Sequence, residues 1–113
     1  MNKAEIRKSC PVSSGVLKYF PDAIKEVAYT SKVGNDQHNP GEPLHWAKEK
    51  SQDEDDAMLR HLMDHFEDPI DDDTCLHLAK VCWRALGNLQ RYLDNNPEMK
   101  AINRLYGNEY SDR

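Results

Sequence analysis

The amino-acid sequence predicts an all-α fold: a bundle of three to four helices with a long loop between the first two, completed by oligomerisation. Apolar residues recur at intervals of three and four over most of the chain, and no segment shows the alternation of a half-buried strand. Capping residues and helix breakers flank the periodic segments. A chain of 113 residues buries only a modest core, so partner subunits are expected to complete it.

The first helix is expected over 21–33, followed by a long loop. Pro21 suits the first helical position, and Gly34 suits the position just after a helix end. Residues 35–50 contain two prolines and a glycine, which break helices. Loops of this length in small domains are often functional.

Three further helices are expected. Ser51 as N-cap and Glu54 form a capping box at the start of the second helix, and Pro69 ends this helix. The third helix is expected over 73–93, and a weaker fourth helix follows Pro97. The second helix carries an apolar face that is expected to point inward, made of Met58, Leu59, Leu62, Met63 and Phe66.

The ends of the chain and its cysteines bound the class of protein. We expect a flexible arm over 1–15, a single all-α domain over 16–107 and a tail over 108–113. The chain has three cysteines with no CxxC pair, no apolar run long enough for a membrane span, and no signal-like start. These features predict a reduced, cytoplasmic protein.

The charge is unevenly distributed. The net charge is −5, which argues against a general nucleic-acid binder. Residues 53–73 hold ten of the 20 acids and a single base, Arg60. An acidic segment beside a mildly basic remainder suits a divalent cation with a phosphorylated ligand. The alternative is an ordinary solvated acidic surface.

Two helices carry candidate ligand-binding stripes. On the third helix, Asp73, His77, Lys80 and Arg84 fall on one face, which suits a metal at one end and phosphate at the other, or is simply the polar outer face. On the second helix, Asp53 and Asp56 are spaced to share Mg²⁺ or Mn²⁺, or are acids favoured by the helix dipole. The spacing of Asp56 and Arg60 also fits a helix salt bridge.

The long loop is rich in groups that recognise a nucleotide base. Amides read the polar edge of a base and an indole stacks on its face. Alternatively, these residues make turns and anchor the loop. Lys50, just before the second helix, would attract phosphate. The candidate base-binding residues are Asn35, Gln37, His38, Asn39 and Trp46.

His61 borders the apolar face of the second helix. It lies four residues from His65, a spacing that can bind zinc, but the HExxH pattern is absent. The sequence also lacks a Walker loop, a GxGxxG motif and a GxSxG motif, so the enzyme classes with those signatures are disfavoured.

Three runs of the chain resemble a known family. The runs GNDQHNPGEPLHW, KSQDEDDAMLRHL and HLAKVCWRALGNLQ are similar to phage-encoded dATP/dGTP diphosphohydrolase-like proteins, the MazZ-type relatives of the MazG enzymes. The resemblance extends over about residues 18–93. It implies an all-α pyrophosphohydrolase that cleaves a purine (d)NTP to (d)NMP and pyrophosphate, uses Mg²⁺ or Mn²⁺, and assembles as a homodimer or homotetramer in the host cytoplasm.

The resemblance implies roles for individual residues. Asp53, Asp56, His61 and His77 would be catalytic, and Asp53, Asp56, Asp73 and His77 would hold metal. The phosphates would contact Lys50, Arg60, Lys80 and Arg84. The chain departs from the MazG acidic motifs: it offers only Asp22 and Glu26 on the first helix, and His77 and Lys80 stand where MazG enzymes have acids. A non-catalytic nucleotide-binding protein and a helical interaction protein therefore remain as alternatives.

Overall fold

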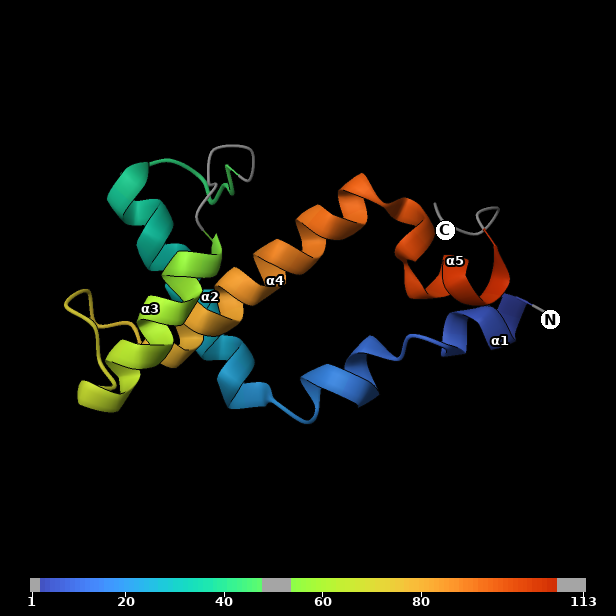
Figure 1. Ribbon diagram of the computed structural model, residues 1–113, viewed down its shortest axis with the longest axis horizontal. Helices are drawn as coiled ribbons and strands as arrows, with labels where there is room; N and C mark the ends of the chain where they lie inside the picture. Colours follow the sequence, from blue (N-terminus) through green and yellow to red (C-terminus); the bar gives the residue numbers. More distant parts are fainter. Residues whose placement is uncertain (1–2, 48–53, 108–113) are drawn as a thin grey trace. The chain divides into compact units, whose positions relative to one another are not determined.

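The computed structural model describes residues 3–47 and 54–107, and these ranges are all-α, as predicted (Figure 1). Apart from one isolated β-bridge between Ile70 and Leu76, the described residues contain no β-structure. No helix among them is long and apolar enough to cross a membrane. The elements are α1 (Lys3–Lys8), η1 (Ser13–Leu17), α2 (Pro21–His38), α3 (Glu54–Glu67), α4 (His77–Asn95), η2 (Pro97–Met99) and α5 (Ala101–Tyr106).

The chain divides into two compact units, the first made of residues 1–21 and 90–113 and the second of residues 22–89. In the first unit, the hydroxyls of Ser9 and Tyr106 lie 2.6 Å apart and join the α1 end of the chain to α5. Residues 3–8, which belong to the predicted flexible arm, form helix α1. None of them is a proline or a glycine, so nothing breaks this helix. The predicted domain limits at 16 and 107 stay a prediction.

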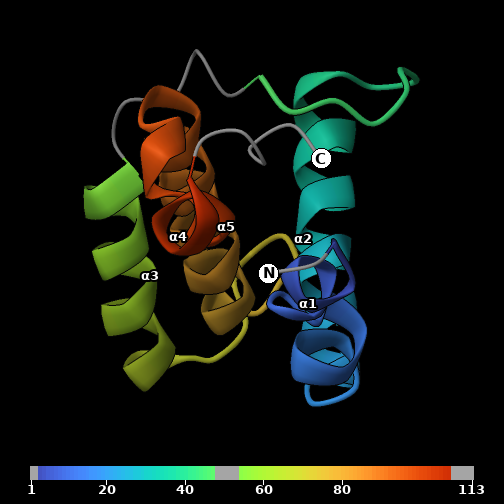
Figure 2. The same ribbon diagram turned by 90° about the vertical axis from the view of Figure 1, so that its right-hand side faces the viewer.

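The second unit contains most of α2, all of α3 and the first part of α4. Both views place α3 beside α4, and Figure 2 shows α4 between α2 and α3. Arg84 on α4 pairs with Glu54 on α3. The hydroxyl of Tyr29 on α2 lies 2.6 Å from the Thr74 hydroxyl in the segment that precedes α4. Polar contacts thus join α3 to α4, and α2 to the segment that precedes α4.

Helix α2 is longer than predicted. It continues through Gly34, which was expected to follow its end, and stops at His38. A glycine inside a helix costs only about 1 kcal/mol relative to alanine, and the next residue, Asn35, is buried and bonded to the following loop. Pro40 cannot continue the helix, and the Asn39 N–H closes the last turn on the Asn35 carbonyl at 2.7 Å. Residues 35–38 therefore lie on the helix and not in the loop.

Helix α4 begins later than predicted, at His77. Asp73, expected within the first helical turn, instead lies in a tight turn. Its carboxylate accepts the Cys75 N–H at 3.1 Å, and the Asp71 N–H donates to the Cys75 carbonyl at 2.8 Å. Such side-chain bonds to nearby backbone compete with helix formation. Thr74 has a φ of 73°, a strained conformation for a β-branched residue.

The apolar face of α3 does not point inward as expected. Leu59, Leu62, Met63 and Phe66 are all exposed, and the buried residues of α3 are Glu54 and Ala57. Helical periodicity identifies an apolar stripe, but it does not say what covers it. Helix α3 ends before Pro69, as predicted, whereas the proposed N-cap Ser51 lies outside the described residues.

Asn35 fastens the start of the loop that follows α2. Its buried amide donates to the Glu42 carbonyl and accepts the His45 N–H, both at 3.2 Å. Asn35→Ala is expected to lower the free energy of unfolding by about 1–2 kcal/mol, because both loop groups lose a partner. Urea unfolding measures this loss. The exposed Gln37→Ala is the control, and an equal loss there would contradict the anchoring role.

Candidate functional site

A cleft of about 740 Å³ lies within the second unit. Its walls come from the C-terminal half of α2, the loop after α2, the inner face of α3 and the first turns of α4. The lining residues are Thr30, Ser31, Gly34, Asn35, Gln37, His38, Asn39, His45, Trp46, Ala47, Glu54, His61, Asp73, Lys80, Trp83 and Arg84. The volume lies within the range typical of small-molecule sites.

Two tryptophans form an aromatic wall. Trp46 from the loop meets Trp83 from α4 edge to face, with ring centroids 5.6 Å apart and planes at 80°. Gly87, one turn beyond Trp83, leaves room for this packing: a Cβ there would lie 3.4 Å from Cζ2 of Trp46. Arg84 lies 5.9 Å from the Trp83 ring centroid, within reach of a cation–π contact.

The polar side chains predicted to bind a base divide into two groups. The amide of Asn35 holds the loop backbone, the role that was the alternative to base recognition. Gln37, His38 and Asn39 line the cleft at the end of α2 and are exposed or half-buried. The structure therefore brings all five predicted base-binding residues, including Trp46, to one cleft.

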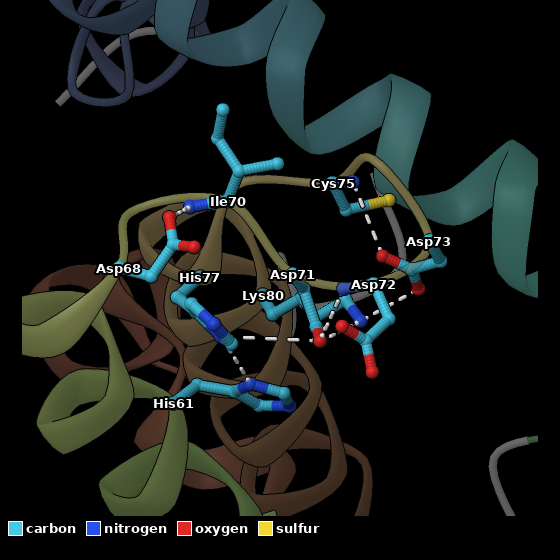
Figure 3. A network of polar contacts seen from close by, with 9 residues as sticks. All are labelled: His61, Asp68, Ile70, Asp71, Asp72, Asp73, Cys75, His77 and Lys80. Carbon is cyan, nitrogen blue, oxygen red and sulfur yellow. Dashed lines mark hydrogen bonds and ion pairs between the residues drawn. The ribbon is translucent and has the colours of Figure 1, made fainter.

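Lys80 joins the loop before α4 to the helix (Figure 3). Its ammonium donates to Asp71 Oδ2 and to Asp73 Oδ2, each at 2.6 Å. The hydrogen bond from Lys80 lowers the pKa of Asp71. Burial opposes ionisation of Asp73, but the bond from Lys80, the bond from the Cys75 N–H and the charge of Lys80 together outweigh it, and the pKa of Asp73 is also lowered. Burial also opposes the charge on Lys80, yet the two carboxylates raise the Lys80 pKa.

Glu54 and Arg84 form a second ion pair, between α3 and α4. Arg84 Nη1 lies 3.1 Å from Glu54 Oε2, and the Glu54 side chain is only 4% exposed. A buried carboxylate is costly unless it is paired, so Arg84 is needed to hold Glu54 at the cleft wall.

We call the side of the cleft formed by Glu54, Asp73, Lys80 and Arg84 the charged wall. Two histidines face each other next to it. The Nδ1 atoms of His61 on α3 and His77 on α4 are 3.0 Å apart, and Asp71 Oδ2 lies 3.9 Å from His77 Nδ1. The side chain of His77 is 8% exposed. Burial, and then the charge of Lys80, lowers the pKa of His61, which favours the neutral imidazole.

Some predicted site residues lie elsewhere. Asp56 and Arg60 are exposed and do not line the cleft, because the inner face of α3 runs through Glu54 and His61 instead. Asp53 and Lys50 lie outside the described residues. Asp73, Lys80 and Arg84 line the cleft, and His77 lies directly behind His61.

Three residues of the site were not predicted. Glu54 was interpreted only as part of a capping box, although it precedes His61 by seven residues, two helical turns on the same face. Asp71 lies before the helix, where a helical wheel does not apply. Trp83 recurs at helical spacing with the leucines of its helix, a pattern that indicates core packing and not a binding site. Of the three, only Glu54 is predictable from helical spacing.

The described residues fit a divalent cation through a group that shares one member, His77, with the predicted ligands. Among the predicted set, Asp56 is exposed and does not line the cleft, and Asp73 is engaged by Lys80. One ligand atom each from His61, Asp71 and His77 lies within 4.8 Å of the others. The three carboxylates of this region outnumber its two cations, Lys80 and Arg84, which leaves negative charge for an ion to neutralise.

Comparison of the chain with protein-family models, with curated proteins and with solved structures finds no match. The fold is a common type of architecture, and a fold by itself does not define an activity. The interpretation of the cleft therefore depends on its own residues and on the sequence runs that supply them.

The Lys80 ion pairs predict a pH-dependent stability. Lys80→Met is expected to lower the free energy of unfolding at pH 7 by about 2 kcal/mol, because two partly buried carboxylates lose their cation. The lowered pKa values of Asp71 and Asp73 stabilise the fold above the ordinary value of 3.8, and this stability is lost as the pH falls through them.

The difference between wild type and Lys80→Met should therefore shrink below pH 3.8. It should also shrink at high pH, as the raised pKa of Lys80, above 10.5, is passed. Urea unfolding over a pH series measures both changes. A difference that stays constant from neutral to acidic pH would contradict the assignment.

Proposed function

We propose that the cleft binds a purine (d)NTP and that the protein is a metal-dependent nucleotide pyrophosphohydrolase of nucleotide-pool metabolism, in the host cytoplasm if it is phage-encoded. The observation that carries the proposal is that one cleft combines a pair of tryptophans with side-chain amides and two cations. The amides belong to Gln37 and Asn39, and the cations are Lys80 and Arg84. Twelve of the sixteen lining residues also fall within the three runs that resemble the dATP/dGTP diphosphohydrolase-like family.

The base fits the aromatic wall. Trp46 and Trp83 offer an edge-to-face pair against which a purine ring packs, and stacking of this kind contributes about 1–3 kcal/mol per base. Gln37 and Asn39 supply amide donors and acceptors for the polar edge of the base. Larger purines gain more from this wall than pyrimidines do.

The triphosphate fits the charged wall. Lys80 and Arg84 are one helical turn apart on α4 and line the same cleft as the tryptophans. Both are paired with carboxylates, so a bare triphosphate would meet Asp73 and Glu54 as well as the two cations. A divalent cation bound with the nucleotide removes this repulsion, which supports the proposed dependence on Mg²⁺ or Mn²⁺.

In the proposed reaction, water attacks the α phosphorus and a new P–O bond forms. The bond between the α phosphorus and the bridging oxygen breaks to release pyrophosphate, and the proton of the attacking water passes to solvent. The described residues that would hold the cation are Asp71, His61 and His77. When bound, the cation supplies Lewis-acid polarisation and a lowered pKa for bound water. Arg84 and Lys80 neutralise the charge that develops on the phosphate oxygens.

A non-catalytic nucleotide-binding protein is the second candidate. It is favoured by the position of Asp56, which lies on the exposed side of α3 and leaves the cleft without the acid expected from the resemblance. Such a protein would use the same tryptophans and cations to sequester a nucleotide. Product formation separates the two candidates.

The exposed face of α3 supports self-association as a homodimer or homotetramer. Leu59, Leu62, Met63 and Phe66 recur at helical spacing, and the exposed fraction reaches 81% at Phe66. The buried apolar residues of the second unit are small, namely Ala57, Cys75 and Ala79. A second copy that packs its own α3 on this stripe would supply the larger core that a helical bundle needs.

The activity is tested with each common (d)NTP plus Mn²⁺ or Mg²⁺, by resolving nucleotides and pyrophosphate chromatographically. Purine substrates are expected to yield monophosphate and pyrophosphate. Arg84→Ala is expected to lower kcat/KM by about 10²- to 10³-fold, because a phosphate-neutralising charge is lost. Arg104→Ala, an exposed arginine of the first unit, is the matched control.

Circular dichroism of both variants verifies that they are folded. Turnover that is unaffected in Arg84→Ala would rule out the charged wall as the binding surface for the phosphates. A thermal shift by a nucleotide without any product would support the non-catalytic candidate instead.

Self-association is tested at Phe66. Phe66→Ser is expected to shift the protein toward the monomer, since it removes the most exposed large side chain of the stripe. Light scattering coupled to size-exclusion chromatography measures the mass. Tyr19→Ser, which alters an aromatic of the first unit that is 71% exposed, should leave the mass unchanged. A wild-type monomer at all concentrations would contradict the proposal.

A further inference from the structure

We infer that His61, His77 and Asp71 form a binding site for a first-row transition-metal dication, which this site selects over Mg²⁺. The inference deepens the proposed function by identifying the ion and its ligands. It rests on the proposed function only for the role of the ion in turnover, because binding of the ion follows from the geometry of the three side chains.

The separation of the two imidazole nitrogens suits a coordination sphere. The Nδ1 atoms of His61 and His77 are 3.0 Å apart. With metal–nitrogen bonds of about 2.1 Å, nitrogens at 3.0 Å subtend an angle of about 90° at the ion, the angle between neighbouring ligands in octahedral geometry. The two rings are tilted by 34° and not stacked flat. Without an ion, the two Nδ1 atoms are at hydrogen-bond distance, and an ion bound by both would replace this hydrogen bond.

Asp71 supplies the third ligand from the same side. Its Oδ2 atom lies 3.9 Å from His77 Nδ1, and all three donor groups lie within 4.8 Å of one another. Figure 3 shows the carboxylate of Asp71 beside the two rings, with Lys80 next to it. Two imidazoles and one carboxylate are a donor set typical of transition-metal sites that keep positions open for substrate.

The three ligands are held on separate elements that are fixed before any ion binds. His61 lies within α3, and His77 is the first residue of α4. Asp71 lies in a segment fastened by the bond from the Ile70 N–H to Asp68 at 3.0 Å and by the Cys75 contact with Asp73. A site with fixed ligands loses little conformational entropy when the ion binds.

Lys80 occupies the position of a competing cation. Its ammonium contacts the same Asp71 oxygen that faces His77. An ion that takes Asp71 leaves Lys80 with Asp73 alone, and the ammonium then becomes available to a phosphate in the cleft. Binding of the ion and binding of the triphosphate are thereby coupled through one side chain.

The donor set determines the selectivity. Mg²⁺ prefers oxygen ligands and gives up water reluctantly, so two imidazoles make a poor site for it. Imidazole nitrogens bind transition metals far better. Mn²⁺ is used as the probe because Cys10 and Cys82 are exposed thiols that would also attract Zn²⁺. Mn²⁺ is the weakest binder of the first-row series, so its preference over Mg²⁺ is a stringent test of the imidazole ligands.

The experiment measures Mn²⁺ binding to the full chain without nucleotide, by loss of the free-ion signal in electron paramagnetic resonance. One Mn²⁺ per chain is expected, and Mg²⁺ in about hundredfold excess is expected to displace less than half of it. His61→Gln and Asp71→Asn are each expected to weaken binding by about tenfold or more. His77 is buried, so the less buried His61 and Asp71 provide the decisive variants.

Two matched controls lie next to the ligands. His65→Gln alters the histidine one turn further along α3, and Asp72→Asn alters the exposed neighbour of Asp71. Both are expected to bind Mn²⁺ as wild type does. The inference would be overturned if equimolar Mg²⁺ displaced half of the bound Mn²⁺. It would also be overturned if His65→Gln weakened Mn²⁺ binding as much as His61→Gln does.

The outcome is separable from that of the proposed function. Selective Mn²⁺ binding without any nucleotide turnover supports the site and contradicts the enzymatic proposal. Turnover that proceeds equally well with Mg²⁺ in His61→Gln supports the enzymatic proposal and removes this site from the reaction, whereas unchanged Mn²⁺ binding in His61→Gln and Asp71→Asn overturns the site itself.

Discussion

The ammonium of Lys80 between Asp71 and Asp73 is the interaction on which the charged wall depends. It fastens the turn before α4 to the helix itself, at 2.6 Å on each side. The turn contains a strained residue, Thr74, and strain persists only where its surroundings determine the conformation. With the turn held, Asp71 faces the pair His61 and His77 that α3 and α4 bring together.

The cleft is a compromise between burial and charge. Glu54 is buried at its wall and needs Arg84, and Arg84 in turn lies against Trp83. The cations that suit a phosphate are thus already committed to carboxylates. A ligand that enters must rearrange these pairs, which gives a cation in the cleft a direct influence on anion binding.

The sequence predicts the class of fold well because helix signals are local. Pro21 and Pro69 mark helix limits that the structure confirms, and the spacing of Lys80 and Arg84 correctly places both on one face of α4. The end of α2 could not be predicted, because a glycine signal at Gly34 was outweighed by contacts that only the folded chain contains. Asp73 lies outside α4, contrary to the prediction from helical spacing, because its side chain accepts a backbone hydrogen bond within the turn.

The site itself could be predicted only in part. Periodicity identifies an apolar stripe on α3, and burial of that stripe within one chain was the natural expectation. The opposite face, with Glu54 and His61, meets α4 instead. Which face of an amphipathic helix turns inward depends on all the partners of that helix, and the candidate acid Asp56 is therefore not among the residues that line the cleft.

The meeting of Trp46 and Trp83 has a practical consequence. The chain contains two tryptophans, and both line the cleft at a centroid separation of 5.6 Å. All indole fluorescence of the protein therefore arises from the cleft wall, with no background from the rest of the chain. Quenching, spectral shift and energy exchange between the two rings report directly on any molecule that enters, without the need for an attached dye.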